Sequence, residues 1–203
     1  MDGCRHISIS AEKGVEEMQL SLEKPIKVLV AGLQGSGKTY LAKKIIKDSG
    51  LRTLVYTPHG DEWDKSDDVY LVKPDDFIND FEEWCKFVKV NAEEGKISCF
   101  MIDELDLIFK HHFDSSPVFR DLVINHRHYD LRIIGVTRRI QDIPTNIYNT
   151  FEVLCLFKIE APQVKDLLNR YHEGLGDMVY NLDFEKHEFV VKKIGQAPKI
   201  AVA

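Results

Sequence analysis

A glycine-rich loop between an apolar run and a helical pattern restricts the fold more than any other segment. Residues 26–31, IKVLVA, are short and β-branched, which is typical of a buried strand. Residues 32–39, GLQGSGKT, follow directly, and residues 38–48 then place Leu41 and Ile45 on one helical face. A strand that passes through a tight loop straight into a helix indicates an α/β unit, in which the helix covers the sheet.

The rest of the chain repeats this alternation of apolar runs and helical patterns. We predict further strands at residues 51–57, 69–72, 97–102, 131–137, 151–157 and 187–194. We predict further helices at residues 75–95, 115–127 and 161–171. Because the strands read as continuous apolar runs, the predicted fold is a three-layer α/β sandwich with a mostly parallel central sheet. Residues 25–203 form the predicted domain, and residues 1–24 a polar extension with two short edge strands at ISIS and MQLSL.

Composition excludes several classes of protein. The 203 residues are 44% apolar and 30% charged, as in an ordinary globular chain, and the net charge of −6 argues against a simple basic coat for nucleic acid. No apolar run approaches the roughly 20 residues of a membrane span, and the first ten residues lack the apolar core of a secretion signal. The four cysteines, Cys4, Cys85, Cys99 and Cys155, are too far apart for a metal motif. Buried free thiols at Cys99 and Cys155 fit a reducing cytoplasm.

The glycine loop matches the pattern G-x-x-x-x-G-K-[ST] between a strand and a helix, where backbone N–H groups cradle a phosphate chain. We predict that Lys38 reaches the β- and γ-phosphates of ATP and that Thr39 ligates Mg²⁺. The alternative is a glycine turn with an incidental lysine. The predicted nucleotide contacts are Gly32, Gln34, Gly35, Ser36, Gly37, Lys38, Thr39 and Tyr40.

Ligands of such sheets bind beyond the carboxyl ends of the strands, here just after residues 31, 57, 102, 137 and 157. At the third of these ends, CFMIDELD places Asp103 to hold Mg²⁺ and Glu104 to orient a water for attack on the γ-phosphate. A first-turn glutamate that merely favours the helix dipole is the alternative for Glu104. We interpret Asp106 as a helix-start acid.

Two adjacent arginines end the strand at residues 131–137, where burial without an anionic partner is costly. If the sheet has the usual hydrolase order, this strand lies beside residues 26–31, and Thr137 and Arg138 face the γ-phosphate. The alternative is that Arg138, Arg139 or both pair with surface carboxylates such as Asp142.

These motifs, in this order, resemble the FtsK–HerA superfamily of ring-forming DNA-pumping ATPases. The closest likeness is to the single-domain genome-packaging ATPases of tailless viruses with internal membranes. It covers residues 26–181 and rests on GLQGSGKT, FMIDE, RHYDLRIIGVTRRIQDIP and GLGDMVY. The resemblance implies a P-loop NTPase fold of the RecA/FtsK type, with Walker A and Walker B elements at Lys38 and Asp103.

The resemblance also implies several site roles. It makes Glu104 the catalytic carboxylate, Thr137 and Arg138 the sensor position, and Arg127 the arginine that neighbouring subunits insert into each other's sites. The chain departs from the family at Arg138, where glutamine is common, and at Ile140, where proline is common. Arg138 is therefore open between a sensor and a finger within its own subunit, and Arg127 between a finger and a cation at a helix end.

The resemblance also implies the function and the partners. The expected protein is a Mg-dependent ATPase that translocates double-stranded DNA without sequence preference and packages a viral genome into a capsid. A ring of five or six copies in the host cytoplasm or on the virion, docked to a capsid vertex or membrane protein, is expected. The expected DNA loops are residues 109–117 and 138–146, with Lys110, His111, His112 and Arg139 as candidate phosphate contacts. The alternatives are a nucleotide or small-molecule kinase, and an ATP-dependent assembly or secretion switch.

Overall fold

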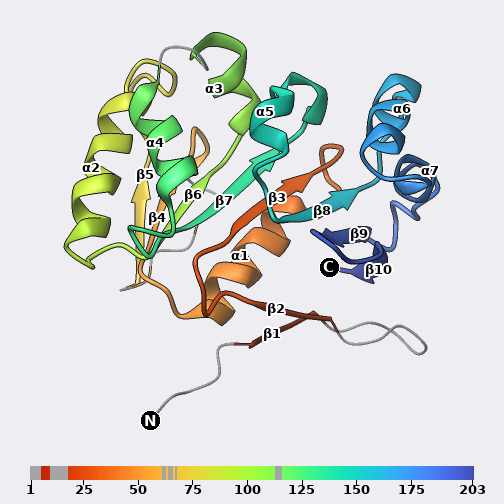
Figure 1. The fold of residues 1–203 in the computed structure, drawn as a ribbon, viewed down its shortest axis with the longest axis horizontal. Helices are drawn as coiled ribbons and strands as arrows, with labels where there is room; N and C mark the ends of the chain where they lie inside the picture. Colours follow the sequence, from red (N-terminus) through yellow and green to blue (C-terminus); the bar gives the residue numbers. More distant parts are fainter. Residues whose placement is uncertain (1–5, 10–17, 61–62, 64–65, 67, 113–115) are drawn as a thin grey trace.

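The computed structural model describes residues 6–9, 18–60, 63, 66, 68–112 and 116–203. Its centre is an eight-stranded sheet, shown edge to edge in Figure 1. The strands lie in the order β10 (Lys199–Val202), β9 (Glu188–Lys193), β8 (Val153–Phe157), β3 (Lys27–Ala31), β7 (Arg132–Thr137), β6 (Cys99–Ile102), β4 (Thr53–Tyr56) and β5 (Val69–Val72). The six strands from β8 to β5 are parallel, whereas β9 and β10 are antiparallel. The predicted α/β fold with a mostly parallel sheet is confirmed.

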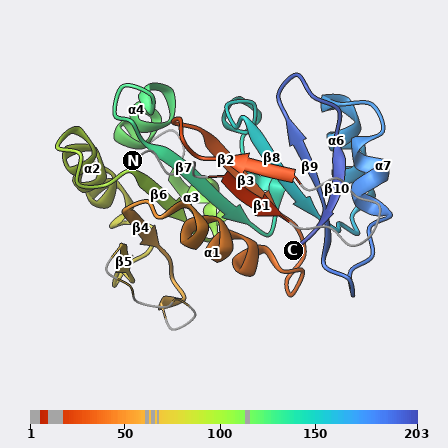
Figure 2. The ribbon, with the colours of Figure 1, turned by 90° about the horizontal axis from the view of Figure 1, so that it is seen from below.

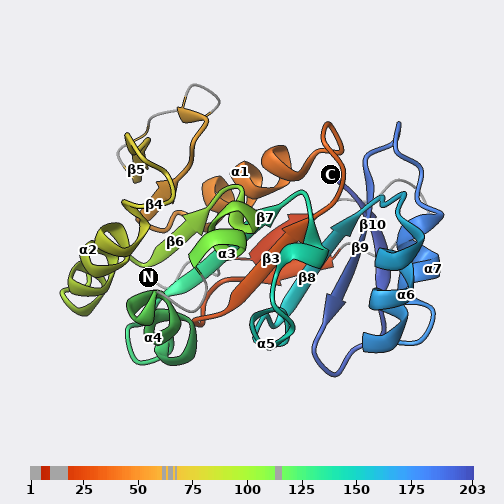
Figure 3. The same cartoon turned by 90° about the horizontal axis from the view of Figure 1, so that it is seen from above.

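Helices cover both faces of this sheet. Helix α1 (Lys38–Ser49) lies on one face. The other face carries α2 (Phe81–Glu93), α3 (Leu105–His112), α4 (Pro117–Asn125) and α5 (Thr145–Tyr148), as Figures 1 and 3 show. Helices α6 (Pro162–Tyr171) and α7 (Leu175–Tyr180) lie beyond β8.

Alternating side chains of the strands build two cores. In β3, Leu29 joins the large core beneath α2 to α7, whereas Val28 and Val30 pack with Leu41 and Ile45 of α1. Side chains along a strand point to opposite faces, so one buried strand serves both layers. This explains why the strand was visible in the sequence as a continuous apolar run.

The strand that ends at Thr137 was predicted to lie beside the strand that leads into the glycine loop, and this is confirmed. Strand β3 pairs with β7 in parallel, with Ala31 opposite Thr137, and β7 also pairs with β6. The ends of β3, β6 and β7 therefore meet at one edge of the sheet.

Several predicted boundaries were wrong. Helix α2 begins at Phe81 rather than near residue 75, because the Asp76 carboxylate accepts hydrogen bonds from the backbone N–H groups of Ile78 and Asn79 and forms a turn there. Helix α3 continues through His112, so the first part of the predicted loop at residues 109–117 is helical. Helices α5 and α7 and strand β10 were not predicted.

Among the described residues, the two strands predicted near the N-terminus, β1 (His6–Ile9) and β2 (Met18–Ser21), pair with each other and not with the central sheet. They lie on the α1 side of the sheet (Figure 2). Between this hairpin and β3, Arg132 fixes the chain: its guanidinium donates to the carbonyl oxygens of Leu22 and Glu23. No helix in the described part of the chain is both long and apolar enough to cross a membrane.

Candidate nucleotide-binding site

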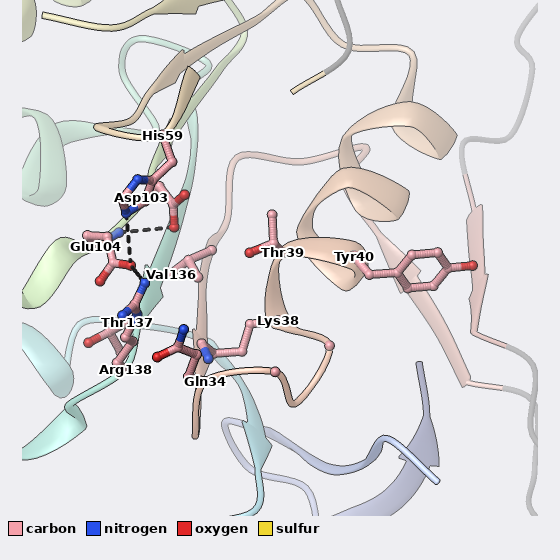
Figure 4. Close-up of a pocket in the computed structure, with 12 residues that line it drawn as sticks. Gln34, Lys38, Thr39, Tyr40, His59, Asp103, Glu104, Val136, Thr137 and Arg138 are labelled. Carbon is pink, nitrogen blue, oxygen red and sulfur yellow. Dashed lines mark hydrogen bonds and ion pairs between the residues drawn. The ribbon is translucent and has the colours of Figure 1, made fainter. Parts of the chain in front are cut away.

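A pocket of about 400 Å³ opens at the carboxyl ends of β3, β4, β6 and β7. It is lined by the glycine loop and the start of α1, by His59, by Asp103 and Glu104, and by the end of β7. In Figure 4 the Thr39 hydroxyl faces the acids across the pocket, whereas Tyr40 points away from them. Four of the five predicted strand ends thus contribute to one cavity.

The backbone of the glycine loop is held on both flanks. Gly32 N–H donates to Thr137 O (3.3 Å) on β7, and Leu33 N–H donates to Lys158 O (3.2 Å) just after β8. A Cβ on Gly32 would lie 2.6 Å from Phe157 Cβ, so only glycine fits there. Gly37, at φ 101°, turns the chain into α1 with a backbone that side chains disfavour.

Lys38 is the first residue of α1 and is nearly buried. Its ammonium donates a hydrogen bond to the carbonyl oxygen of Leu33, within the loop itself. Burial and, to a smaller extent, the neighbouring Arg138 lower the pKa of Lys38 to about 8. An anion in the pocket stabilises the charged form, so the site favours a group such as a polyphosphate.

Asp103 follows β6 and is held from two sides. Thr57 Oγ1 donates to Asp103 Oδ2 (3.1 Å), and Glu104 N–H donates to Asp103 Oδ1 (3.1 Å). Thr57 Oγ1 in turn accepts from His59 N–H (3.0 Å), which ties the turn after β4 to the acid. The position of Asp103 is therefore fixed by the neighbouring strand.

Glu104 lies between Arg138 and His59. Its Oε1 is 2.6 Å from Arg138 Nη2 and 3.8 Å from His59 Nε2. Burial raises the pKa of Glu104, and Arg138 opposes that shift. Its backbone has φ 54°, the left-handed region that a glutamate rarely adopts. The carboxylate is thus held in the pocket by a strained turn and by Arg138.

The two arginines that end β7 have different partners. Arg138 pairs with Glu104, whereas Arg139 Nε lies 2.8 Å from Asp142 Oδ2 and its side chain is 63% exposed. The alternative considered from the sequence, pairing with Asp142, holds for Arg139 only. Thr137, which is buried, donates its hydroxyl to Asp106 Oδ1 (2.7 Å).

Arg127 lies at the opposite edge of the sheet, near the amino ends of β3 and β8. Its guanidinium forms an ion pair with Glu152, and its side chain is 71% exposed. Glu152 also accepts from Lys27 N–H (2.8 Å) at the start of β3 and lies 3.5 Å from the buried His126. About 20 Å of β7 separates this edge from the pocket, so Arg127 does not reach the pocket of its own chain.

The candidate DNA contacts divide into two groups. Lys110, His111 and His112 lie in the last turn of α3, and their side chains are outside the described part of the structure. Arg139 is exposed near the rim of the pocket.

Two site residues were missed from the sequence. His59 approaches Glu104, and Asp106, interpreted as a helix-start acid, also bonds to the end of β7. The rule that ligands bind after strand ends already marked the segment after residue 57, so His59 could have been found. Nothing in the sequence pattern pairs Asp106 with Thr137, because 31 residues separate them.

The donor set fits magnesium bound with a nucleotide. Among the described residues, no three His, Cys, Asp or Glu side chains form a metal-binding group. Mg²⁺ at phosphate sites takes one or two protein oxygens together with phosphate oxygens and waters. The Thr39 hydroxyl and the Asp103 carboxylate, facing each other across the pocket, are such a pair.

Comparison with known proteins agrees with this geometry. A family profile described as "ATPase family associated with various cellular activities (AAA)" matches residues 28–159. No curated relative matches the sequence.

Solved structures with the same fold include the DNA-packaging ATPase B204 of Sulfolobus turreted icosahedral virus, at 20% identity and TM-score 0.74 over 88% of this chain and 98% of that one. B204 of Sulfolobus turreted icosahedral virus 2, in complex with ATP-gammaS, is 18% identical with TM-score 0.73 over 87% and 96%. The cytoplasmic domain of the type VII secretion ATPase EccC of Thermomonospora curvata is 12% identical with TM-score 0.77, over 98% of this chain and 28% of that chain.

At these identities the likeness shows the fold, and in that respect the resemblance to packaging ATPases drawn from the sequence is confirmed. The profile spans most of the chain and includes the glycine loop, the two acids and the end of β7. The chain therefore belongs to the AAA family of ATPases.

Proposed function

We propose that this protein hydrolyses ATP with Mg²⁺ to translocate double-stranded DNA and that it packages a viral genome as a ring of identical subunits. The observation that carries the proposal is the meeting of Lys38, Thr39, Asp103 and Glu104 in one pocket. The structural likeness to B204, a DNA-packaging ATPase, supports the choice of DNA as the second substrate.

Each residue of the pocket has a proposed part in hydrolysis. Lys38 and the loop backbone bind the β- and γ-phosphates, and Thr39 and Asp103 hold magnesium, which neutralises charge on the phosphate oxygens when it is bound. Glu104 accepts a proton from the water that attacks the γ-phosphorus, so the products are ADP and inorganic phosphate. Because Glu104 is paired with Arg138, its carboxylate turns to the water only when Arg138 takes another anion, and the γ-phosphate is the natural one.

Glu104→Gln tests this assignment. The amide keeps the size of the side chain but accepts no proton, so turnover should fall about 10²- to 10⁴-fold. Binding of a fluorescent ATP analogue should persist, because the loop and Lys38 are unchanged. Lys38→Ala, in contrast, should lose the binding itself. Equal turnover in Glu104→Gln and the unmodified protein would refute the assigned role.

DNA dependence separates the proposed motor from its alternatives. Duplex DNA of any sequence should stimulate ATP hydrolysis by the proposed translocase. Transfer of phosphate to a nucleoside monophosphate would instead identify a kinase. Hydrolysis that ignores DNA but responds to a protein substrate would favour the assembly or secretion switch.

Arg127 supports assembly into a ring. It lies far from the pocket of its own chain and is exposed, as an arginine that acts on a neighbouring subunit must be. Such an arginine is worth roughly 10³- to 10⁵-fold in rate. Mixing Arg127→Ala with Glu104→Gln subunits should restore part of the activity that each variant lacks alone. A mixture that never exceeds the sum of its parts would assign Arg127 to a structural role with Glu152.

The DNA-binding surface is proposed to include Lys110, His111, His112 and Arg139. Contacts to phosphates release counterions, so their loss weakens binding to all sequences alike. Lys110→Ala should flatten the dependence of log K on log salt by about one unit. An unchanged slope would remove Lys110 from the surface. Docking of the ring to a capsid vertex or a membrane protein, in the host cytoplasm or on the virion, belongs to the same proposal.

A further inference from the structure

Asp106 is a buried carboxylate at the start of α3, and the hydrolysis mechanism proposed above assigns it no role. Only 5% of the residue is exposed, although it belongs to the first turn of a helix. An acid that served the helix dipole alone would be stabilised equally well in contact with water. A carboxylate buried away from water needs hydrogen-bond donors, and those of Asp106 come from the end of strand β7.

The donors to Asp106 are both at the end of β7. Thr137 Oγ1 donates to Asp106 Oδ1 (2.7 Å), and the backbone N–H of Arg138 donates to the same oxygen (3.3 Å). The Thr137 oxygen accepts in turn from the backbone N–H of Arg139 (3.2 Å). One carboxylate thus holds three consecutive residues of the strand end.

This network occupies the only proton of the Thr137 hydroxyl. A hydroxyl has one O–H to donate, and here it is given to Asp106. The Thr137 side chain therefore has no donor to offer a γ-phosphate while the bond persists. The part of the strand end that does face the pocket is the Arg138 side chain, which lies 2.6 Å from Glu104.

We propose that Asp106 is a positioning residue: by bonding to Thr137 and to the Arg138 backbone, it fixes the strand end that presents the Arg138 guanidinium to Glu104 and to the γ-phosphate. Asp106 does not line the pocket and acts through Arg138. The close packing of the same elements agrees with this, because a Cβ on Gly135 of β7 would lie 2.6 Å from Leu105 of α3. Helix α3 and β7 therefore hold the acid and the arginine in one rigid arrangement. The inference rests on the proposed hydrolysis of ATP.

Single variants give the first test, in steady-state ATPase assays. Asp106→Ala and Thr137→Val each break the bond and should lower kcat about 10- to 100-fold, with KM for MgATP changed less than threefold. Asp106→Asn and Thr137→Ser, which keep an acceptor and a hydroxyl respectively, should lose much less. Asp48→Ala is the matched control, because Asp48 is a helical acid whose ion pair within the described structure is with Lys44 on the surface.

The decisive test is a double-mutant cycle with Arg138→Gln. If Asp106 acts through Arg138, adding Asp106→Ala to Arg138→Gln should lower kcat less than twofold further. If Asp106 only supports the fold, its full effect should reappear in that background, and the inference is overturned. The inference also fails if Thr137→Val has the kcat of the unmodified protein. Should Asp106→Ala not fold, the same cycle runs with Thr137→Val.

These outcomes are distinct from failure of the proposed function. An unmodified protein that hydrolyses no ATP, with or without DNA, refutes both. An active protein with additive effects of Asp106 and Arg138 refutes the positioning role alone.

Discussion

Arg132→Lys should destabilise the fold far more than its conservative appearance suggests. The Arg132 side chain is 5% exposed, and its guanidinium makes four contacts at the start of β7. Its Nε donates to Leu22 O (2.9 Å), Nη2 to Glu23 O and Nη1 to Asp130 O, and Nη1 also lies 3.0 Å from Asp130 Oδ2. The arginine therefore ties the segment before β3 to the start of β7.

The magnitude follows from the number of bonds that lysine cannot make. A single ammonium lacks the planar fork that reaches carbonyl groups on separate segments, so about two charge-assisted bonds are lost. Each is worth roughly 1.5–3 kcal/mol, and a buried carbonyl left without a donor adds to the cost. Taking the lower figure for each bond, we expect a loss of about 3 kcal/mol, a large share of the 5–15 kcal/mol typical of a domain.

Urea denaturation followed by circular dichroism measures this loss, with Arg139→Lys as the matched control. The Arg139 side chain is 63% exposed, and the ion pair that the structure describes for it is with Asp142 three residues away, so its replacement should change the unfolding free energy by less than about 0.5 kcal/mol. Limited proteolysis should cut Arg132→Lys near residues 22–24 faster than the control. A loss below 1 kcal/mol, or equal losses in the two variants, would refute the reasoning.

Three further predictions test the loop, a surface ion pair and a buried thiol. Gly32→Ala should abolish nucleotide binding and cost about 1–3 kcal/mol in unfolding free energy, because its Cβ would collide with Phe157; unchanged binding in a titration with ATP would contradict this. Asp121→Asn should cost about 1 kcal/mol at pH 7, since the Lys89 hydrogen bond lowers the pKa of Asp121 from 3.8 to about 2. That stabilisation is present above pH 4 and lost as the pH falls towards 2, so the two unfolding curves should converge in acid. Cys99 should resist iodoacetamide at pH 8 in the folded protein and react in urea, because burial raises the pKa of its thiol to about 12, and mass spectrometry reads both states.

The layered α/β fold could be predicted because its signals are local. Each buried strand is a short apolar run, and the glycine loop joins the first of them to a helix whose apolar face is visible in the sequence. The start of α2 could not be predicted, because both the turn at Asp76 and a helix at residue 75 suit the same acidic residues. The closing strand β10 has only four residues and exposes two of them, so its pattern is weak.

In the candidate site, too, some features could be predicted from the sequence and others could not. Lys38 and Asp103 were predicted to share a pocket from motifs that fix a strand end, and the structure brings them together. Which partner each charged side chain takes depends on strand pairing across the sheet, which a motif does not encode. The pairing of Arg138 with Glu104 and of Arg127 with Glu152 therefore had to come from the structure.

The left-handed backbone of Glu104 sets the stability of the fold against the role that we propose for its carboxylate. A non-glycine residue in that conformation costs about 1–2 kcal/mol, which glycine would not incur. Glycine at position 104 would relieve this strain and would also remove the carboxylate that we propose accepts the proton of the attacking water. Strained backbone of this kind gathers at active sites, which agrees with the role that we propose for Glu104.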